Sequence, residues 1–287
     1  MIQELFSIGS FSISPFGVML VVALLAAYAQ LVSEMRRLGI GGEDDASAIV
    51  VGCGLAGIAG GKVYYAALYG DWRLVFDRSG IVWYGCFLAG LATFLWLVRR
   101  RGLPFGRTLD AGALCLALAY GIGRIGCFLV GDDYGKPTDL PWGVAFKKGI
   151  PATTARNLEE HFGIEPPPGA APGDFVAVHP TQVYETLAAL GIWIFLRRLA
   201  RRDLRPGTTF LTGVSLLSLE RFLIEFLRAK DDRFFGELTL AQVISLAVLL
   251  TMGAVALLRF FKAPEAAEAR AGAKAGAKSG ARPTRTG

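Results

Sequence analysis

Seven long apolar runs, separated by shorter polar stretches, dominate the pattern of this 287-residue chain. A helix needs about 20 mainly apolar residues to cross the hydrocarbon core of a bilayer, and each run approaches that length. The pattern therefore predicts an all-α fold, that of a polytopic membrane protein with seven transmembrane helices. We expect these spans at residues 15–33, 46–70, 80–98, 111–131, 180–196, 208–227 and 238–258.

The polar connections define the rest of the predicted architecture. Residues 132–179 form the longest connection, rich in Pro and Gly and without a sustained helical or strand period, so we expect a small irregular head. Residues 1–262 would form the membrane domain, with this head included. Residues 263–287 contain almost no large apolar side chain, which predicts a disordered basic tail. The first run should not be a cleaved signal peptide, because Glu4 and no basic residue precedes it.

Basic residues are distributed unevenly between the two sides of the predicted bundle. The loops after the first, third and fifth spans and the C-terminal tail hold eighteen Lys and Arg residues, and the opposite side holds nine. Because cytoplasmic loops carry an excess of basic residues, the N-terminus should lie outside and the C-terminus in the cytoplasm. The same distribution accounts for the net charge of +6, which therefore does not indicate a nucleic-acid partner.

Composition supports the membrane assignment and excludes several other classes. Hydrophobic residues make up 53% of the chain and charged residues 19%, against about 25% charged in soluble domains. The four cysteines lie in apolar runs without a C-x-x-C pair or a suitably spaced histidine, which indicates small buried side chains rather than disulfides or a zinc site. No G-x-x-x-x-G-K-[ST] motif for nucleotide binding occurs, so we expect no metal and no other cofactor.

Polar and ionisable residues of the predicted spans gather near the outer side. Arg124 lies about 10 Å below the outer end of the fourth span, and an arginine in hydrocarbon costs about 2.5–3.5 kcal/mol, so it needs a partner or an anion. Arg221, Glu225 and Arg228 share one face of the sixth span. We infer a cavity at headgroup depth for an anionic phospholipid, with arginines on the phosphate and carboxylates holding the arginines. The other members of this outer group are Lys62, Tyr84, Asp132, His179, Gln182, Tyr184, Glu185 and Glu220.

The same residues allow purely structural interpretations. Arg124 could pair with a carboxylate of a neighbouring helix, and Arg221 with Glu225 could be a simple i, i+4 pair. Tyr84 could belong to an aromatic belt at the membrane surface. His179 could merely precede the proline that opens a helix.

Four segments carry a resemblance to a known family. They are GRIGCFLVGDDYGKPT at 123–138, HPTQVYE at 179–185, RFLIEFLR at 221–228 and SGIVWYGCFLAG at 79–90. In this order they resemble the signatures of bacterial prolipoprotein diacylglyceryl transferase. The resemblance covers all seven spans and excludes the C-terminal tail. Four motifs in the correct order are specific, whereas any one of them alone would be weak.

The resemblance implies an enzyme of the bacterial plasma membrane that moves the diacylglyceryl group of phosphatidylglycerol to the lipobox cysteine thiol of prolipoproteins. The product is a thioether, and glycerol phosphate leaves. By position, Arg124 and Arg221 would bind and neutralise the departing phosphate. Lys62 stands where the family tends to have an arginine. The residues implied to line or support the cavity are Gly131, Gln182, Glu185, Glu225 and Arg228.

The chain departs from the family pattern at the proposed proton acceptor. The family's histidine at the start of the third span is Tyr84 here, the asparagine of the signature is Cys127, and the N-G-E that follows is V-G-D at 130–132. Phe16 and Leu217 stand at the positions of two tyrosines. The phosphate-binding part is thus retained, and the histidine is not.

The missing histidine leaves three accounts of how the substrate thiol loses its proton. A cysteine thiol has an ordinary pKa of about 8.5, and a tyrosine hydroxyl, at about 10, is a weak base at neutral pH. Tyr84 could be activated by nearby arginines, or His179 or Asp132 at the outer rim could accept the proton. In the third account, which we favour, a positive cavity acidifies the thiol and most catalysis comes from stabilising the phosphate leaving group.

Two rival functions are compatible with the sequence. Tyr84 and Cys127 allow a diverged relative that uses another lipid donor or another acceptor. A non-catalytic binder or transporter of anionic lipid is the rival from a different class. A transporter would be expected to show inverted repeats, interrupted helices and polar residues in the cytoplasmic half as well. Polarity confined to one side of seven spans favours the transferase.

Overall fold

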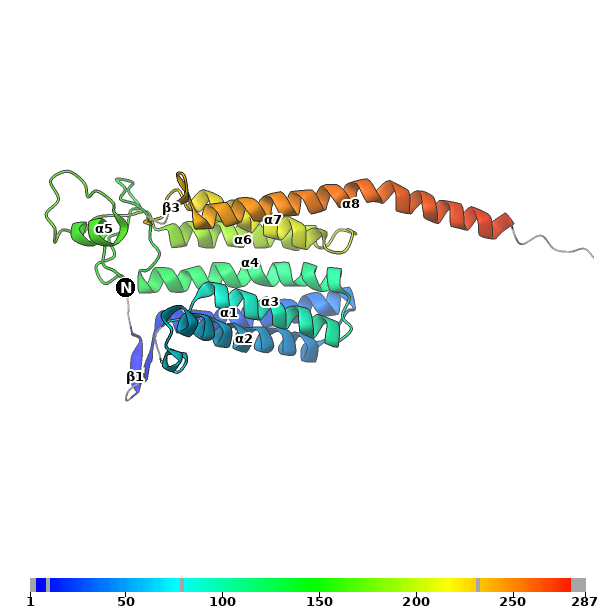
Figure 1. Ribbon diagram of the computed structural model, residues 1–287, viewed down its shortest axis with the longest axis horizontal. Coiled ribbons are helices and arrows are strands. Elements are labelled where there is room, and N and C mark those ends of the chain that lie inside the picture. Colours follow the sequence, from blue (N-terminus) through cyan, green and yellow to red (C-terminus); the bar gives the residue numbers. More distant parts are fainter. Residues whose placement is uncertain (1–3, 9–10, 78–79, 231–232, 280–287) are drawn as a thin grey trace, which may run out of the picture.

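The computed structural model describes residues 4–8, 11–77, 80–230 and 233–279, and this part of the chain is mostly helical (Figure 1). Two short antiparallel hairpins pair β1 (Phe6–Ile8) with β2 (Phe11–Ile13) and β3 (Arg233–Phe235) with β4 (Leu238–Thr239). The helices are α1 (Pro15–Leu38), α2 (Glu43–Tyr69), the 3-10 helix η1 (Trp72–Val75), α3 (Trp83–Arg100), α4 (Phe105–Val130), α5 (Ala155–Phe162), α6 (Thr181–Leu199), α7 (Thr208–Ile224) and α8 (Leu240–Ser279).

Each predicted span coincides with one long helix, α1–α4 or α6–α8. By length and composition, four helical segments can cross a membrane: α1, α2, α4 and the Leu240–Arg259 part of α8. The other three helices, α3, α6 and α7, have 18, 19 and 17 residues and lie alongside these four (Figure 1). The prediction of a helical, multi-pass membrane protein is therefore confirmed at this level.

The helix α4 lies in the middle of the bundle, between α1 on one side and α6 and α7 on the other (Figure 1). The helices α2 and α3 pack as a pair, and α8 packs along α7. The α2–α3 contact depends on glycine, since a Cβ atom at Gly85 would lie 2.3 Å from the carbonyl oxygen of Gly60. Small residues of this kind let the backbones of membrane helices approach closely.

Large apolar side chains cover the outside of the bundle as well as its interior. Leu25, Leu55, Leu187 and Leu250 are 62–67% exposed, and they come from four different helices. A soluble protein rarely presents apolar surface on this scale, whereas the hydrocarbon of a bilayer solvates it well. The outer surface of the bundle thus agrees with the membrane assignment.

The segment between α4 and α6 packs around its own small apolar core. Tyr134, Phe146, Leu158 and Val178 are almost completely buried there, and the rings of Tyr134 and Phe146 stack. Most of the segment is irregular, as expected, but it includes α5, which the sequence analysis missed. Thr154 caps α5 by accepting a hydrogen bond from the backbone N–H of Asn157, a typical N-cap contact.

The described part of the predicted basic tail, residues 263–279, belongs to the last part of α8. The helix α8 continues to Ser279 and extends well beyond the other helices (Figure 1). The physical reason is the high alanine content of this part, because alanine has the highest intrinsic helix propensity. The remaining tail residues, 280–287, lie outside the described residues.

Candidate active site

Local backbone geometry places two acidic residues over the end of α4. The helix ends at Gly131, whose φ of 81° is left-handed and suits a glycine. Asp133 also has a positive φ, 58°, which aspartate tolerates better than most residues. The side chains of Gln182 and Thr181 donate hydrogen bonds to the carbonyls of Asp132 and Asp133, respectively. These bonds fasten the turn after α4 to the first turn of α6.

Arg124 lies below this turn with only 15% of its side chain exposed. Its Nη1 donates a hydrogen bond of 2.9 Å to Asp133, and its Nε lies 3.3 Å from a carboxylate oxygen of Glu185. Its guanidinium group also lies 5.2 Å from the ring centroid of Tyr120, one turn earlier on α4. Two carboxylates and an aromatic ring thus fix the orientation of this arginine.

Glu185 is the common partner of three arginines. Its side chain is fully buried and lies within 3.3 Å of Arg124, 3.7 Å of Arg228 and 4.0 Å of Arg221. Arg221 also lies 2.6 Å from Glu225, one turn later. Charged side chains from α4, α6 and α7 therefore lie together, as the sequence analysis predicted from their shared position at the outer side.

Four further members of the cluster were not among the predicted site residues. Tyr120 donates a hydrogen bond of 3.0 Å to Glu185 and lies 3.4 Å from Glu220. Thr239, the last residue of β4 and directly before α8, donates a hydrogen bond of 3.2 Å to Glu225. Asp133 pairs with both Arg124 and Arg228. The signals for Tyr120 and Glu220 were their positions one turn before Arg124 and beside Arg221; no sequence signal identifies Thr239.

The cluster contains no excess of positive charge. The three arginines face three carboxylates within ion-pair distance, those of Asp133, Glu185 and Glu225. Glu220 and Asp132 lie beside them as two more acidic groups. Buried charges of this kind need such partners, because an unpaired charge is expensive to remove from water.

The cluster nevertheless offers unused hydrogen-bonding capacity. Among the described residues, several buried atoms make no hydrogen bond of good geometry, although some take part in ion pairs. Since buried polar groups are normally satisfied, a polar occupant such as a phosphate or water would find donors and acceptors ready. The atoms are Asp132 Oδ1, Gln182 Oε1, Glu185 Oε2, Glu220 Oε1, Arg221 Nη1, Glu225 Oε2, and Nε and Nη1 of Arg228.

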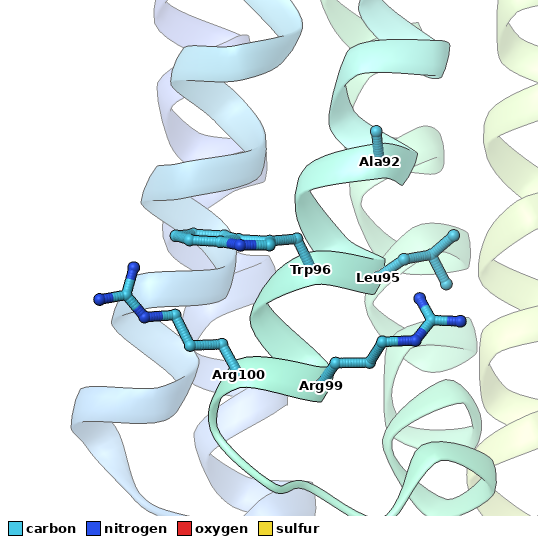
Figure 2. Close-up of a pocket in the computed structure, with 5 residues that line it drawn as sticks. All are labelled: Ala92, Leu95, Trp96, Arg99 and Arg100. Atoms are coloured by element: carbon cyan, nitrogen blue, oxygen red, sulfur yellow. The ribbon is translucent and has the colours of Figure 1, made fainter.

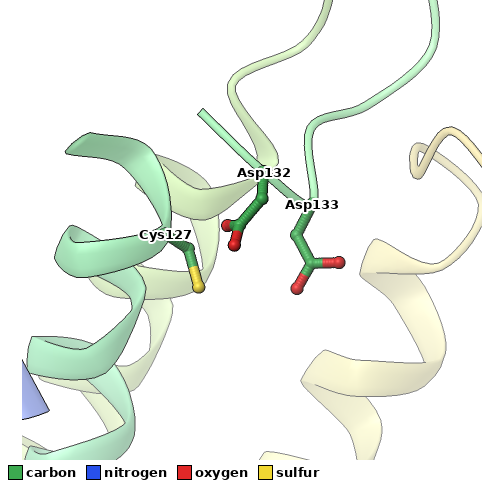
Figure 3. Close-up of side chains that lie close together, drawn as sticks. All are labelled: Cys127, Asp132 and Asp133. Carbon is green, nitrogen blue, oxygen red and sulfur yellow. The ribbon is translucent and has the colours of Figure 1, made fainter. Parts of the chain in front are cut away.

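The two neighbouring aspartates have different electrostatic environments (Figure 3). The carboxylate of Asp132 points toward Cys127, and burial together with the charge of Asp133 raises the pKa of the Asp132 carboxyl. Burial also raises the pKa of Asp133, but Arg228 and Arg124 outweigh it, and the net pKa of Asp133 lies below its ordinary value. The ligand atoms of all three residues lie within 4.8 Å of one another, a spacing compatible with a metal ion. Two arginines already bind Asp133, and they would oppose a cation.

Three predicted site residues have their contacts elsewhere. Tyr84, in the first turn of α3, is 38% exposed and packs its ring edge-on against Trp83. Lys62 donates a hydrogen bond to the backbone carbonyl of Asp77. His179 lies 3.3 Å from the hydroxyl of Tyr184, and burial lowers the pKa of its imidazole. In the described part of the chain, no hydrogen bond or ion pair joins these three residues to the arginine cluster.

A groove of about 560 Å³ lies at the far end of α3, away from this cluster (Figure 2). Arg100 and Arg99 extend from the helix there, and the guanidinium group of Arg100 lies 4.9 Å from the ring centroid of Trp96. Ala92 and Leu95 complete the lining. The residues that line this groove include no acid, general base or nucleophile, so the arginine cluster remains the candidate site.

Comparison with known proteins agrees with the geometry. The family model described as prolipoprotein diacylglyceryl transferase matches residues 3–259. A phosphatidylglycerol–prolipoprotein diacylglyceryl transferase of Clostridium tetani is 28% identical over 254 residues, which cover 86% of this chain and 93% of the relative. The proteins of the same name from Geobacter sulfurreducens and Stenotrophomonas maltophilia are 26% and 30% identical, covering 85% and 90% of this chain and 90% and 91% of the relatives. The match extends over nearly the whole chain, and the chain belongs to the prolipoprotein diacylglyceryl transferase family.

Proposed function

We propose that this protein transfers the diacylglyceryl group of phosphatidylglycerol to the lipobox cysteine of prolipoproteins. The reaction forms a thioether and releases glycerol phosphate, the first step of lipoprotein maturation. The observation that carries the proposal is the cluster of three arginines around the buried Glu185. The family match and the names of the relatives support the same donor and acceptor.

In this reaction the sulfur attacks the glycerol carbon that carries the phosphate, and the C–O bond to the phosphate breaks. Negative charge then develops on the departing phosphate, and guanidinium groups that are already oriented stabilise it without reorganisation. Arg124 and Arg221 expose 15% and 25% of their side chains, against 5% for Arg228. The first two are therefore the phosphate ligands, and Arg228 positions the carboxylates around them.

Asp133 is the carboxylate that the phosphate most readily replaces. Its side chain is 40% exposed and lies on the turn after α4, whereas the side chains of Glu185 and Glu225 are fully buried. A phosphate that contacts Arg124 takes over the position that Asp133 holds in this structure. The buried glutamates keep the arginines in place during this exchange.

The position of the site supports the membrane orientation that we propose. All seven long helices span the plasma (inner) membrane, with the N-terminus outside and the C-terminus in the cytoplasm. The basic loops after α1, α3 and α6 lie at the end of the bundle opposite to the arginine cluster (Figure 1). The cluster then faces the outer leaflet, beneath the head formed by 132–179. The lipid donor enters sideways from this leaflet, and the prolipoprotein enters from the same membrane.

The test is thioether formation by the purified protein with phosphatidylglycerol and a lipobox cysteine peptide. We expect turnover by the wild type and a loss of at least about 100-fold in Arg124→Ala, the size seen when one stabilising donor is removed. Arg100→Gln, at the far end of α3, is the matched control and should retain activity. Turnover that is equal in Arg124→Ala and the wild type would contradict the proposed site, and an inactive wild type that still binds the lipid would contradict the transferase. Tyr84→His, measured in parallel, shows whether the family's histidine adds to the rate.

A further inference from the structure

The identity of the group that accepts the thiol proton follows from the structure, provided that the proposed transfer is correct. A substrate thiol with a pKa of about 8.5 is mostly protonated at neutral pH and is then a poor nucleophile. Either the surroundings must lower its pKa, or a base must lie within reach. The contacts of the cluster distinguish between these possibilities.

A positive cavity does not fit the observed charges. Each arginine of the cluster already has a carboxylate within ion-pair distance, and Glu185 lies within 4.0 Å of all three. Because the carboxylates of the cluster are at least as many as its arginines, the cluster has no excess of positive charge that would acidify a substrate thiol. The interpretation favoured from sequence, in which the cavity alone acidifies the thiol, therefore loses its physical basis.

The ring of His179 is already engaged through its Nδ1 atom. The hydroxyl of Tyr184 accepts a hydrogen bond of 2.7 Å from the indole N–H of Trp142, so its own proton is available for Nδ1 of His179 at 3.3 Å. His179 thus belongs to a network within the head. Tyr84, as described above, packs on Trp83 at the start of α3. Neither residue shares a hydrogen bond or ion pair with the arginines in the described chain.

Asp132 has the geometry that the other two candidates lack. Its Oδ1 is buried and has no hydrogen-bond partner among the described residues. Its backbone is held on both sides, since its N–H donates to the carbonyl of Cys127 and its carbonyl accepts from Gln182. Its carboxylate points toward the sulfur of Cys127, which itself lies 3.7 Å from Nη1 of Arg124 (Figure 3). The sulfur of Cys127 shows that a thiol placed at this point lies within reach of both the carboxylate and the phosphate-binding arginine.

We propose that Asp132 is the general base that accepts the proton of the substrate cysteine thiol. The S–H proton moves to Oδ1 of Asp132, and the thiolate forms a C–S bond to the diacylglyceryl carbon. The C–O bond to the phosphate breaks, and its electron pair leaves on the glycerol phosphate. The proton then passes from Asp132 to the released phosphate or to water, which restores the carboxylate.

The neighbours of Asp132 suit this role. Burial and the adjacent Asp133 raise the pKa of the Asp132 carboxyl, while Arg124 and Arg228 act in the opposite direction. A higher pKa brings the Asp132 carboxyl closer to the pKa of a thiol, and transfer of the thiol proton to Asp132 then becomes more favourable. Asp133 is kept ionised by the same two arginines. Two adjacent carboxyls thereby take different roles, one as a base and one as an ion-pair partner.

Thioether formation by Asp132→Asn, measured across pH 6 to about pH 10, tests this assignment. At neutral pH we expect kcat/KM to fall by about 10²–10⁴-fold, the usual contribution of a general base, with KM for phosphatidylglycerol unchanged. The loss should diminish about tenfold per pH unit as the peptide thiol ionises by itself. Asp132→Glu should restore part of the rate. Asp139→Asn, which changes an exposed acid of the same loop, is the matched control and should behave as the wild type.

Two outcomes would overturn the assignment. An Asp132→Asn enzyme with the wild-type rate and pH profile would show that another group takes the proton. A loss that high pH does not restore, accompanied by a higher KM for the lipid, would show a role in lipid binding alone. Failure of the proposed transfer itself is distinguishable, because the wild type would then form no thioether at any pH.

Discussion

Glu185→Gln tests whether one buried carboxylate holds the three arginines of the proposed active site together. The substitution preserves the shape of the side chain but removes its charge, and it places an amide N–H₂ group against guanidinium donors. Breaking a buried ion pair on one side costs about 3–5 kcal/mol, because it leaves an uncompensated charge. Arg124 keeps Asp133 and Arg221 keeps Glu225 as second partners. We therefore expect a loss near the lower end of this range, about 3 kcal/mol.

The loss can be measured as the free energy of unfolding of the purified protein in detergent micelles, followed by circular dichroism. Glu43→Gln is the matched control, since Glu43 pairs with Arg36 and their side chains are 60% and 61% exposed. An exposed pair contributes less than about 1 kcal/mol, so this variant should be close to the wild type. The reasoning is refuted if Glu185→Gln destabilises the protein no more than Glu43→Gln does.

Two further predictions concern helix packing and acid stability. Gly85→Ala should destabilise the protein by about 1–3 kcal/mol, because its Cβ would lie 2.3 Å from the carbonyl oxygen of Gly60; Gly253→Ala, whose Cβ meets nothing within 4 Å, should not destabilise it in the same unfolding assay. Asp133 has a lowered pKa in the folded state, so its contribution to stability is complete above its ordinary pKa and disappears as the pH falls through the folded value. Thermal unfolding between about pH 6 and pH 3 should therefore show a steeper acid loss in the wild type than in Asp133→Asn, and equal slopes would contradict the ion-pair assignment.

The apolar pattern was sufficient to locate the seven long helices, but not their ends. The fourth helix begins at Phe105 rather than at 111, because its first turns carry polar residues and already lie outside the apolar run. The third begins at Trp83 rather than at 80, since the N–H of Val82 bonds to the carbonyl of Gly61 and the backbone there is extended. The hydropathy pattern indicates which residues lie in hydrocarbon, whereas backbone hydrogen bonds determine the residue at which a helix begins.

The candidate site was predictable to a similar degree. Arg124, Glu185 and Arg221 could be grouped because their depths in the predicted spans coincide, and the structure brings them together. The role of Asp133 could not be predicted, since its contact with two arginines depends on a left-handed backbone conformation that sequence does not specify. The contacts of Tyr84 could not be predicted either, because the depth of a residue in a predicted span does not say which neighbour its side chain contacts.

The ion pairs of the three arginines affect both the stability of the proposed site and its selectivity for an anionic lipid. An arginine in an apolar setting costs about 2.5–3.5 kcal/mol even on insertion scales, so three arginines without partners would oppose folding. The buried Glu185 and Glu225 offset most of that cost, and Asp133 offsets the rest. In the proposed mechanism a lipid phosphate replaces Asp133 and restores its ion pairs, which a headgroup without an anionic group could not do. The ion pairs that stabilise the arginines in the membrane thereby also favour an anionic lipid. In the described chain no arginine lies within ion-pair distance of Asp132, so its carboxylate is available for the substrate thiol.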